Sequence, residues 1–429
     1  MDAIFHIGMH KTGSTAIQHV FSNLTMDHLR YAPTGRDLGH RGFGTTNHSG
    51  LLAAMFHEPA EDYHSFQRRG LSTAEVSEVR DTANRYFKEF AHGEGKCLFS
   101  AEYLSSVHGF NFEAFAEFAK SRFNQIQIIG YVRAPVSYMQ SRLQQMLKAG
   151  RLPERMPEKL LNSRLLEPEF RKAFQRFDSA FGKKNVTLKP FQPDHLIDGD
   201  VIADFANLIG YSGLLSPAKE ANTSLSQAAT GLLLLQRTHG SGVHVGYADA
   251  NAHNEVFIRM IRQVGGPKLS LGVDFSDQQL SRMKRYTGWM EERLGARIDD
   301  LDDPRPNSVI TASELIETGV QNVTIWKDVL LKALDIPQLK PHHRLFRHSL
   351  LKAFLDGDTL IPHLYEKGHT PRQRDLRAAV TTKDENALKE DIIAAMELPH
   401  LSPTDRAIKL LEAGKLLAEL SSPKQRRFP

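Results

Sequence analysis

This sequence of 429 residues contains a single cysteine and no long apolar run. Cys97 has no second thiol in the chain with which to form a disulfide, so nothing in the composition requires an oxidising compartment. No stretch approaches the roughly 18 apolar residues that span a bilayer, and the opening segment lacks the basic region, apolar run and cleavage site of a signal peptide. We therefore expect a cytoplasmic protein with no membrane span.

The chain also lacks a strong excess of either charge. Its 54 basic and 50 acidic side chains leave a formal net charge of +4, too close to neutral for general nucleic-acid binding. A local anion site is compatible with this balance. The 20 histidines show no spacing typical of a metal site, since His342 and His343 are adjacent and cannot face one ligand from a helix. We expect neither a nucleic-acid partner nor a metal centre.

Short apolar strands alternate with helical patterns over the first half of the chain. The clearest strands are 3–8, closed by Gly8, and 126–132, which is apolar almost throughout, as in a strand buried on both faces of a parallel sheet. Similar patterns predict strands at 96–100 and 186–191, and helices at 14–24, 72–91, 111–122 and 199–210. The alternation predicts an α/β fold of three layers, with helices on both faces of a central parallel sheet.

From about residue 224 the pattern becomes helical. The acidic, proline-bearing segment 299–307 is the best candidate for a linker. We therefore expect one α/β domain over residues 1–300 and a helical C-terminal region over residues 305–429. Within that region the sequence predicts short helices at 351–355, 385–396 and 404–420. The role of the region and the oligomeric state stay open.

The segment Gly8–Thr15, GMHKTGST, lies where the first strand becomes the first helix. Backbone N–H groups and the helix dipole both point at an incoming anion there. The segment differs from a Walker A loop, because that motif has lysine directly before Ser/Thr, whereas Lys11 stands three residues before Ser14. An ordinary strand-to-helix turn is the alternative, but Lys, Thr, Gly, Ser and Thr in one loop favour an anion site.

A second basic position follows the strand at 126–132. Arg133 stands at the end of this strand, Pro135 suits the first turn of a helix, and Ser141 follows two turns later. The guanidinium offers a forked, permanently charged donor set suited to phosphate, and the serine hydroxyl can add one hydrogen bond. Taken alone, an arginine at a sheet edge and a serine exposed on a helix explain these residues equally well.

HIGMHKTGSTAIQ closely resembles the 5′-phosphosulfate-binding loop of sulfotransferases that use 3′-phosphoadenosine 5′-phosphosulfate (PAPS). The resemblance covers about residues 1–300 and implies a P-loop-like domain that releases 3′-phosphoadenosine 5′-phosphate (PAP). It implies that Lys11 contacts the bridging oxygen and the sulfate. It also implies a 5′-phosphate site at Thr12, Gly13, Ser14 and Thr15, and a 3′-phosphate site at Arg133 and Ser141.

Sulfuryl transfer to a hydroxyl needs a base near the acceptor oxygen. Glu102 follows the strand at 96–100, at the edge where open α/β sheets bind ligands, and the resemblance implies a Glu or His base at a comparable place. Alternatively, Glu102 only begins a helix, where the helix dipole favours a negative charge. His48, after the first helix, is the second candidate base. Ser100 is a candidate sulfate contact and Phe191 a candidate adenine contact.

We therefore expect a PAPS-dependent sulfotransferase acting on a hydroxyl acceptor, which analogy with the family alone implies to be a carbohydrate or glycan. Two alternatives stay open. A P-loop small-molecule kinase is disfavoured by the position of the lysine and by the lack of a clear magnesium-binding aspartate after a strand. A non-catalytic nucleotide-binding protein would work through its helical C-terminal region.

Overall fold

The computed structural model of the chain describes residues 1–24, 29–35, 46–67, 70–91, 94–150, 158–211, 213, 224–239, 254–334 and 402–421. The chain forms two compact units. The first consists of Met1–Ser141, Arg164–Thr223 and Phe275–Pro304, and the second of Arg142–Ser163, Ser224–Asp274 and Arg305–Pro429. Helix α6 (Pro135–Lys148) begins in the first unit and ends in the second.

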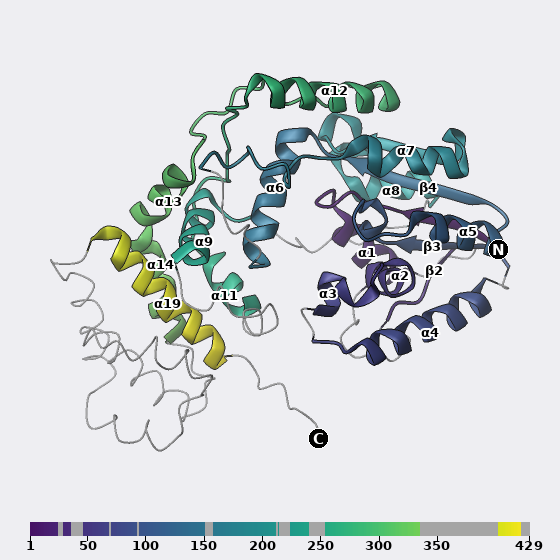
Figure 1. The fold of residues 1–429 in the computed structure, drawn as a ribbon, viewed down its shortest axis with the longest axis horizontal. Helices are drawn as coiled ribbons and strands as arrows, with labels where there is room; N and C mark the ends of the chain where they lie inside the picture. The colour runs from purple at the N-terminus through teal and green to yellow at the C-terminus, as the bar shows by residue number, and fades with distance from the viewer. Residues whose placement is uncertain are drawn as a thin grey trace, which may run out of the picture. The chain divides into compact units, whose positions relative to one another are not determined.

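A five-stranded parallel sheet lies at the centre of the first unit (Figure 1). Its order is β2-β3-β1-β4-β5, and its strands are β1 (Asp2–His6), β2 (Leu29–Tyr31), β3 (Lys96–Ser100), β4 (Ile126–Val132) and β5 (Val186–Pro190). The chain builds β2 and β3 on one side of β1 before it builds β4 and β5 on the other. Open parallel sheets bind ligands at the carboxyl ends of the strands, where the order reverses in this way.

Alternate side chains of the strands enter two separate apolar clusters. Phe5 and Phe99 stack at 4.9 Å between ring centroids on one face, whereas Ile4 and Leu98 point to the other. The first face is covered by α2 (Ser49–Phe56), α3 (His64–Gln67), α4 (Thr73–Phe90), α5 (Phe112–Arg122), α7 (Phe170–Phe181) and α12 (Asp277–Leu294). The second face is covered by α1 (Ser14–Phe21) and α8 (Val201–Ile209). The expected three-layer α/β architecture is confirmed.

The strands and helices predicted in this unit agree with the structure to within three residues at each end. The sequence patterns missed β2, α2, α3 and α7. A strand of only three residues, such as β2, is too short to display a period-two alternation. Length does not explain the omission of α7, whose buried Phe170, Phe174, Phe177 and Phe181 have clear helical spacing.

The second unit is helical in the part of the chain that the structure describes. Besides the end of α6 it contains α9 (Gln227–His239), α11 (Asn254–Ile261), α13 (Ala312–Gln321), α14 (Val323–Leu334) and α19 (Pro403–Ser421). Helices α9 and α13 approach at Gly231, where a Cβ atom would lie 2.0 Å from the carbonyl oxygen of Leu315. The indole of buried Trp326 packs over Gly414 and donates to the carbonyl of Leu410 at 3.1 Å.

The boundaries of the compact units differ from the expected division into residues 1–300 and 305–429. One boundary falls at Pro304, inside the expected linker, but residues 142–163 and 224–274 group with the C-terminal helices. The predicted helix at 404–420 corresponds to α19, and the segments 351–355 and 385–396 lie outside the described residues. None of the described helices combines the length and the apolar character needed to cross a membrane.

Candidate functional site at the carboxyl edge of the sheet

The loop between β1 and α1 has an unusual backbone. Gly8, Lys11 and Gly13 all have positive φ angles, of 79°, 65° and 77°. Left-handed residues turn successive backbone N–H groups toward one side, which makes an anion-binding concavity. The N-terminus of α1 has no side-chain cap and no acidic residue in its first turn. Its first N–H groups and the helix dipole are therefore available to an anion.

Close packing explains both glycines of the loop. A Cβ atom on Gly13 would lie 2.7 Å from Cγ1 of Val201, at the start of α8. A Cβ atom on Gly8 would lie 2.9 Å from the Cβ atom of Glu102, which begins the short 3₁₀ helix η2 (Glu102–Ser105) after β3. The loop is thus held between these two segments, and any larger residue would displace it.

The four polar side chains of the loop that were expected to contact the phosphosulfate differ in exposure. Thr12 is fully buried, and its hydroxyl donates to the carbonyl of Met9 at 2.7 Å. Ser14 is also buried, with its hydroxyl 3.5 Å from the same carbonyl. Thr15 is exposed and Lys11 is half-buried. Thr12 therefore stabilises the loop from inside, and its own hydroxyl is already used.

Arg133 joins the second predicted motif to the first. Its Nη1 donates to the carbonyl of Lys11 at 2.7 Å, and its guanidinium lies 5.9 Å from the ring centroid of Phe191. Burial lowers the pKa of Arg133, and the charge of Asp300 opposes this shift. The arginine is thus fixed beside the loop with further N–H groups left to donate. Ser141 lies on α6 and is half-buried, and within the described residues no hydrogen bond joins its side chain to the loop.

Glu102 lies against the loop as well. It is half-buried, and its Oε2 accepts a hydrogen bond of 2.9 Å from Nε2 of Gln18. Gln18 is 2% exposed and sits on α1, one turn beyond Ser14. A buried amide donor of this kind restrains the carboxylate in one orientation. The structure therefore brings Lys11, Arg133 and Glu102 to one edge of the sheet.

His48 occupies a different environment from the one its loop position suggested. It is fully buried between Tyr31 and Phe99, with ring-centroid distances of 4.9 and 5.5 Å. Its Nδ1 accepts from the backbone N–H of Ser100 at 3.0 Å, and its Nε2 donates to the carbonyl of Ala32 at 2.6 Å. With both ring nitrogens engaged, His48 holds β2, β3 and α2 together. Of the two candidate bases, only Glu102 lies against the loop.

Ser100 and His6 form a buried pair under the loop. Nδ1 of His6 and the hydroxyl of Ser100 are 2.7 Å apart, and both residues are fully buried. Burial lowers the pKa of His6 to about 3, so the ring is neutral at ordinary pH. Ser100 thus interacts with His6, and Phe191 lies beneath Arg133.

Two residues of this edge were not anticipated from the sequence. Gln18 is one, and its only signal is the helical spacing of four residues from Ser14. The other is Asp300, in the expected linker, which is 6% exposed and accepts from the backbone N–H groups of Val136 and Ser137 at 2.8 and 3.0 Å. A carboxylate therefore occupies the N-terminus of α6, whereas that of α1 has no such cap.

Comparisons with known proteins return no relative. No protein family matches the chain, and neither curated proteins nor solved structures contain a match. Among the described residues, no group of three or more His, Cys, Asp and Glu side chains is arranged to hold a metal ion. The function must therefore be argued from the chemistry of the site.

Proposed function

We propose that the chain is a PAPS-dependent sulfotransferase that transfers a sulfuryl group to a hydroxyl acceptor. The observation that supports this most is the 2.7 Å hydrogen bond from Nη1 of Arg133 to the carbonyl of Lys11. It joins two motifs that lie 122 residues apart and that the resemblance assigns to the two phosphate groups of one nucleotide. A loop carbonyl can accept from any nearby donor, but the donor here is the arginine that the resemblance assigns to the second phosphate.

Each positive group has a separate task in this proposal. The loop N–H groups and the uncapped start of α1 bind the 5′-phosphate. Lys11 contacts the sulfate and the bridging oxygen. The remaining N–H groups of Arg133 donate to the 3′-phosphate, with Ser141 as a second donor. The half-burial of Lys11 and Arg133 strengthens these interactions, because water screens them less than it would on an open surface.

The chemical step requires one proton transfer and one displacement. Glu102 accepts the proton of the acceptor hydroxyl while the acceptor oxygen forms a bond to sulfur. The bond between sulfur and the bridging oxygen breaks, and its electron pair leaves with PAP. Lys11 stabilises the charge that develops on that oxygen. Because Oε2 of Glu102 accepts from Gln18, the second carboxylate oxygen is available to the acceptor.

A cytoplasmic location and a carbohydrate acceptor belong to this proposal and rest on the sequence and on the resemblance. The acceptor is best sought by incubating the protein with labelled donor and a panel of hydroxyl compounds that includes neutral and acidic sugars. Transfer to any sugar would support the carbohydrate class. Transfer to phenols or steroid alcohols alone would contradict it.

Calorimetry with PAP and with ATP plus magnesium, at matched salt, tests the nucleotide. We expect PAP to bind, and Arg133→Ala to weaken it about tenfold or more, as the loss of a charge-assisted hydrogen bond implies. Arg85→Ala, at an exposed position on α4, is the matched control. Binding of ATP with magnesium but not of PAP would favour the small-molecule kinase. PAP binding without transfer to any acceptor would favour the non-catalytic nucleotide-binding protein.

A further inference from the structure

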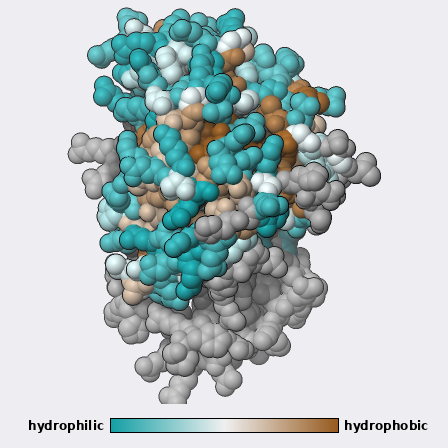
Figure 2. Space-filling view, turned by 90° about the vertical axis from the view of Figure 1, so that its right-hand side faces the viewer, coloured by the Kyte–Doolittle hydropathy of each residue, from teal (hydrophilic) through white to brown (hydrophobic). Residues whose placement is uncertain are grey.

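A pocket lies at the opposite edge of the same sheet, where the parallel strands begin. It has a volume of about 640 Å³ and is lined by the first residues of β1, β3 and β4, by the end of α5 and α7, and by the 3₁₀ helix η3 (Lys183–Asn185) before β5. Figure 2 views the molecule from the side on which the N-terminus lies in Figure 1, and hydrophobic residues gather there between hydrophilic ones. None of the site residues described above lines this pocket.

Three lysines give the pocket a positive rim. Lys96, Lys120 and Lys184 are exposed and come from three different elements, and Asp2 is the one acidic residue of the lining. Within the part of the chain that the structure describes, none of the three takes part in an ion pair. Other lysines of the same unit are paired, since Lys172 binds Glu169 and Lys284 binds Asp302. Asp2 is the register partner of Lys96 in the sheet, so the three lysines share one carboxylate and the rim keeps an excess of positive charge.

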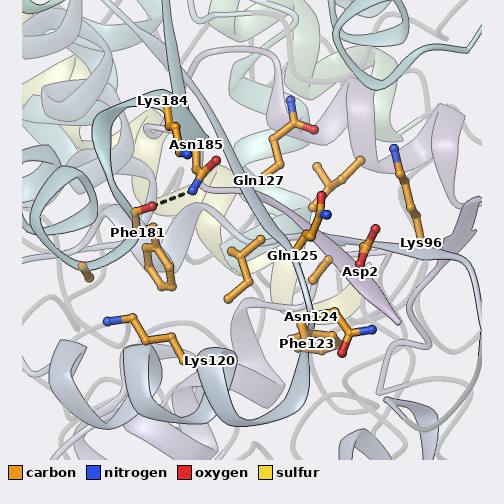
Figure 3. A pocket seen from close by; sticks show the side chains of 14 residues that line it. Asp2, Lys96, Lys120, Phe123, Asn124, Gln125, Gln127, Phe181, Lys184 and Asn185 are labelled. Atoms are coloured by element: carbon orange, nitrogen blue, oxygen red, sulfur yellow. Dashed lines mark hydrogen bonds between the residues drawn. The ribbon is translucent and has the colours of Figure 1, made fainter.

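The order of the strands fixes how these charges are arranged. Along the edge β3-β1-β4-β5 come first Lys96, then Asp2, then Gln125 and Gln127, and finally Lys184. Figure 3 shows the same arrangement, with Lys120 and Lys184 on one side of the pocket and Lys96 on the other. Because neighbouring strands lie about 4.8 Å apart, the backbones at the two ends of this row are separated by roughly 14 Å.

The middle of the pocket is polar but not positive. Asn124, Gln125 and Gln127 supply amide groups that both donate and accept hydrogen bonds, and Asp2 supplies an acceptor. The floor is closed by Phe123 and Phe181, which are 5% and 8% exposed. Amides and a carboxylate suit hydroxyl groups, whereas the ionised oxygens of a phosphate chain only accept hydrogen bonds and offer no donor to Asp2.

We propose that this pocket binds an acidic oligosaccharide, whose anionic groups contact the lysines at the two ends and whose hydroxyl groups contact the amides and Asp2 between them. The ligand is elongated, because the cations lie at both ends of the row. This site is separate from the phosphate loop and does not depend on the proposed sulfuryl transfer.

Titration calorimetry at low salt tests the class of ligand with three probes: trigalacturonic acid, neutral maltotriose and inorganic tripolyphosphate. Each probe is titrated twice, once without PAP and once with saturating PAP. A probe that binds at the phosphate loop is recognised because PAP lowers its apparent affinity. We expect trigalacturonic acid to bind about tenfold or more tightly than either other probe. Absence of trigalacturonate binding, competition by PAP, or equal binding of tripolyphosphate would each overturn the proposal.

Neighbouring lysines provide a matched control for the location. Lys184→Gln removes a cation of the pocket, whereas Lys183→Gln removes the adjacent one, which lines a different depression beside α12. We expect Lys96→Gln and Lys184→Gln each to weaken trigalacturonate about three- to tenfold, and Lys183→Gln to leave its affinity unchanged. These lysines are exposed, so thermal unfolding should be unaltered. Equal effects of Lys183→Gln and Lys184→Gln would show that general surface charge, not the pocket, attracts the probe.

Discussion

The two edges of the central sheet carry polar groups in contrasting ways. At the carboxyl edge, Arg133 is held on the carbonyl of Lys11, and Glu102 is held by buried Gln18. At the amino edge, Lys96 and Lys184 extend from the surface, and the described residues offer them no ion pair. Groups already fixed lose little freedom when a ligand binds, whereas long exposed side chains must be ordered.

This difference separates two kinds of task. Chemistry depends on donors and bases that do not rearrange as charge develops, and the carboxyl edge meets that requirement. Reversible binding of a charged ligand tolerates mobile side chains, and the amino edge is suited to it. The comparison predicts that substitutions at the carboxyl edge change turnover and stability strongly, and that those at the amino edge change only ligand affinity.

The largest expected effect is that of Glu102→Gln. The amide cannot accept the acceptor proton, so the rate of sulfuryl transfer should fall about 10²- to 10⁴-fold, as is typical when a general base is removed. The affinity for PAP should stay within about twofold, because the base does not contact the nucleotide in the proposed site. Single-turnover transfer of labelled sulfuryl measures the first quantity and calorimetry the second.

Glu89→Gln, at an exposed position on α4, is the control for Glu102→Gln and should transfer at the rate of the unaltered protein. If Glu102→Gln retained the full rate of transfer, Glu102 would not be the base. Because both nitrogens of His48 are engaged, the second candidate base would not replace it.

The next largest effect concerns the packing of the phosphate loop. Gly13→Ala should lower the free energy of unfolding by about 2–4 kcal/mol. Alanine is strained at a positive φ of 77°, and its Cβ atom would lie only 2.7 Å from Val201. Gly210→Ala is the matched control, since Gly210 has a φ of 74° but no atom near the added Cβ, and it should cost about 1–2 kcal/mol. Urea unfolding measures both.

A double variant sharpens this test. Adding Val201→Ala to Gly13→Ala removes the atom that the new methyl group would meet, so part of the lost stability should return. If Gly13→Ala lowers the free energy of unfolding no more than Gly210→Ala does, α8 does not hold the loop tightly. The contrast between the carboxyl and amino edges of the sheet would then lose its main support.

Acid should weaken the carboxyl edge through His6. Its pKa is lowered to about 3 by burial, so the folded state binds fewer protons than the unfolded state below the ordinary value of 6.5. Stability therefore falls as the pH decreases through 6.5 toward 3, by up to about 2 kcal/mol between pH 7 and pH 5. Urea unfolding at both pH values should show a smaller loss for His6→Leu. An identical loss in the variant would mean that other groups cause it.

The sequence predicted most of the first unit because its signals are local. The strands 96–100 and 126–132 have the same bounds in the structure, and the loop from Gly8 to Thr15 lies where expected. Arg133 could be assigned to the same edge, because the carboxyl ends of parallel strands meet there.

Contacts between distant residues escaped the sequence patterns. Gln18 and Glu102 lie 84 residues apart, and Asp300 caps a helix more than 160 residues earlier in the chain. His48 was a candidate base from its place after the first helix, yet the backbone of Ala32 and Ser100, after β2 and at the end of β3, engages both its nitrogens. Such pairings depend on which segments the fold brings together, and no periodicity in one segment reports them.

Gln18 gives the smallest effect and the finest test of the comparison. Gln18→Leu keeps an apolar stem on α1 but removes the donor to Oε2 of Glu102, so the carboxylate is free to turn. We expect kcat to fall about tenfold while the affinity for PAP changes little, because a misplaced base slows the chemical step without altering nucleotide contacts. His19→Gln, at the exposed neighbouring position, should leave both quantities unchanged. A loss of thermal stability with unchanged kcat would instead show that Gln18 only supports the packing of α1, and that the orientation of Glu102 is fixed by the backbone of η2.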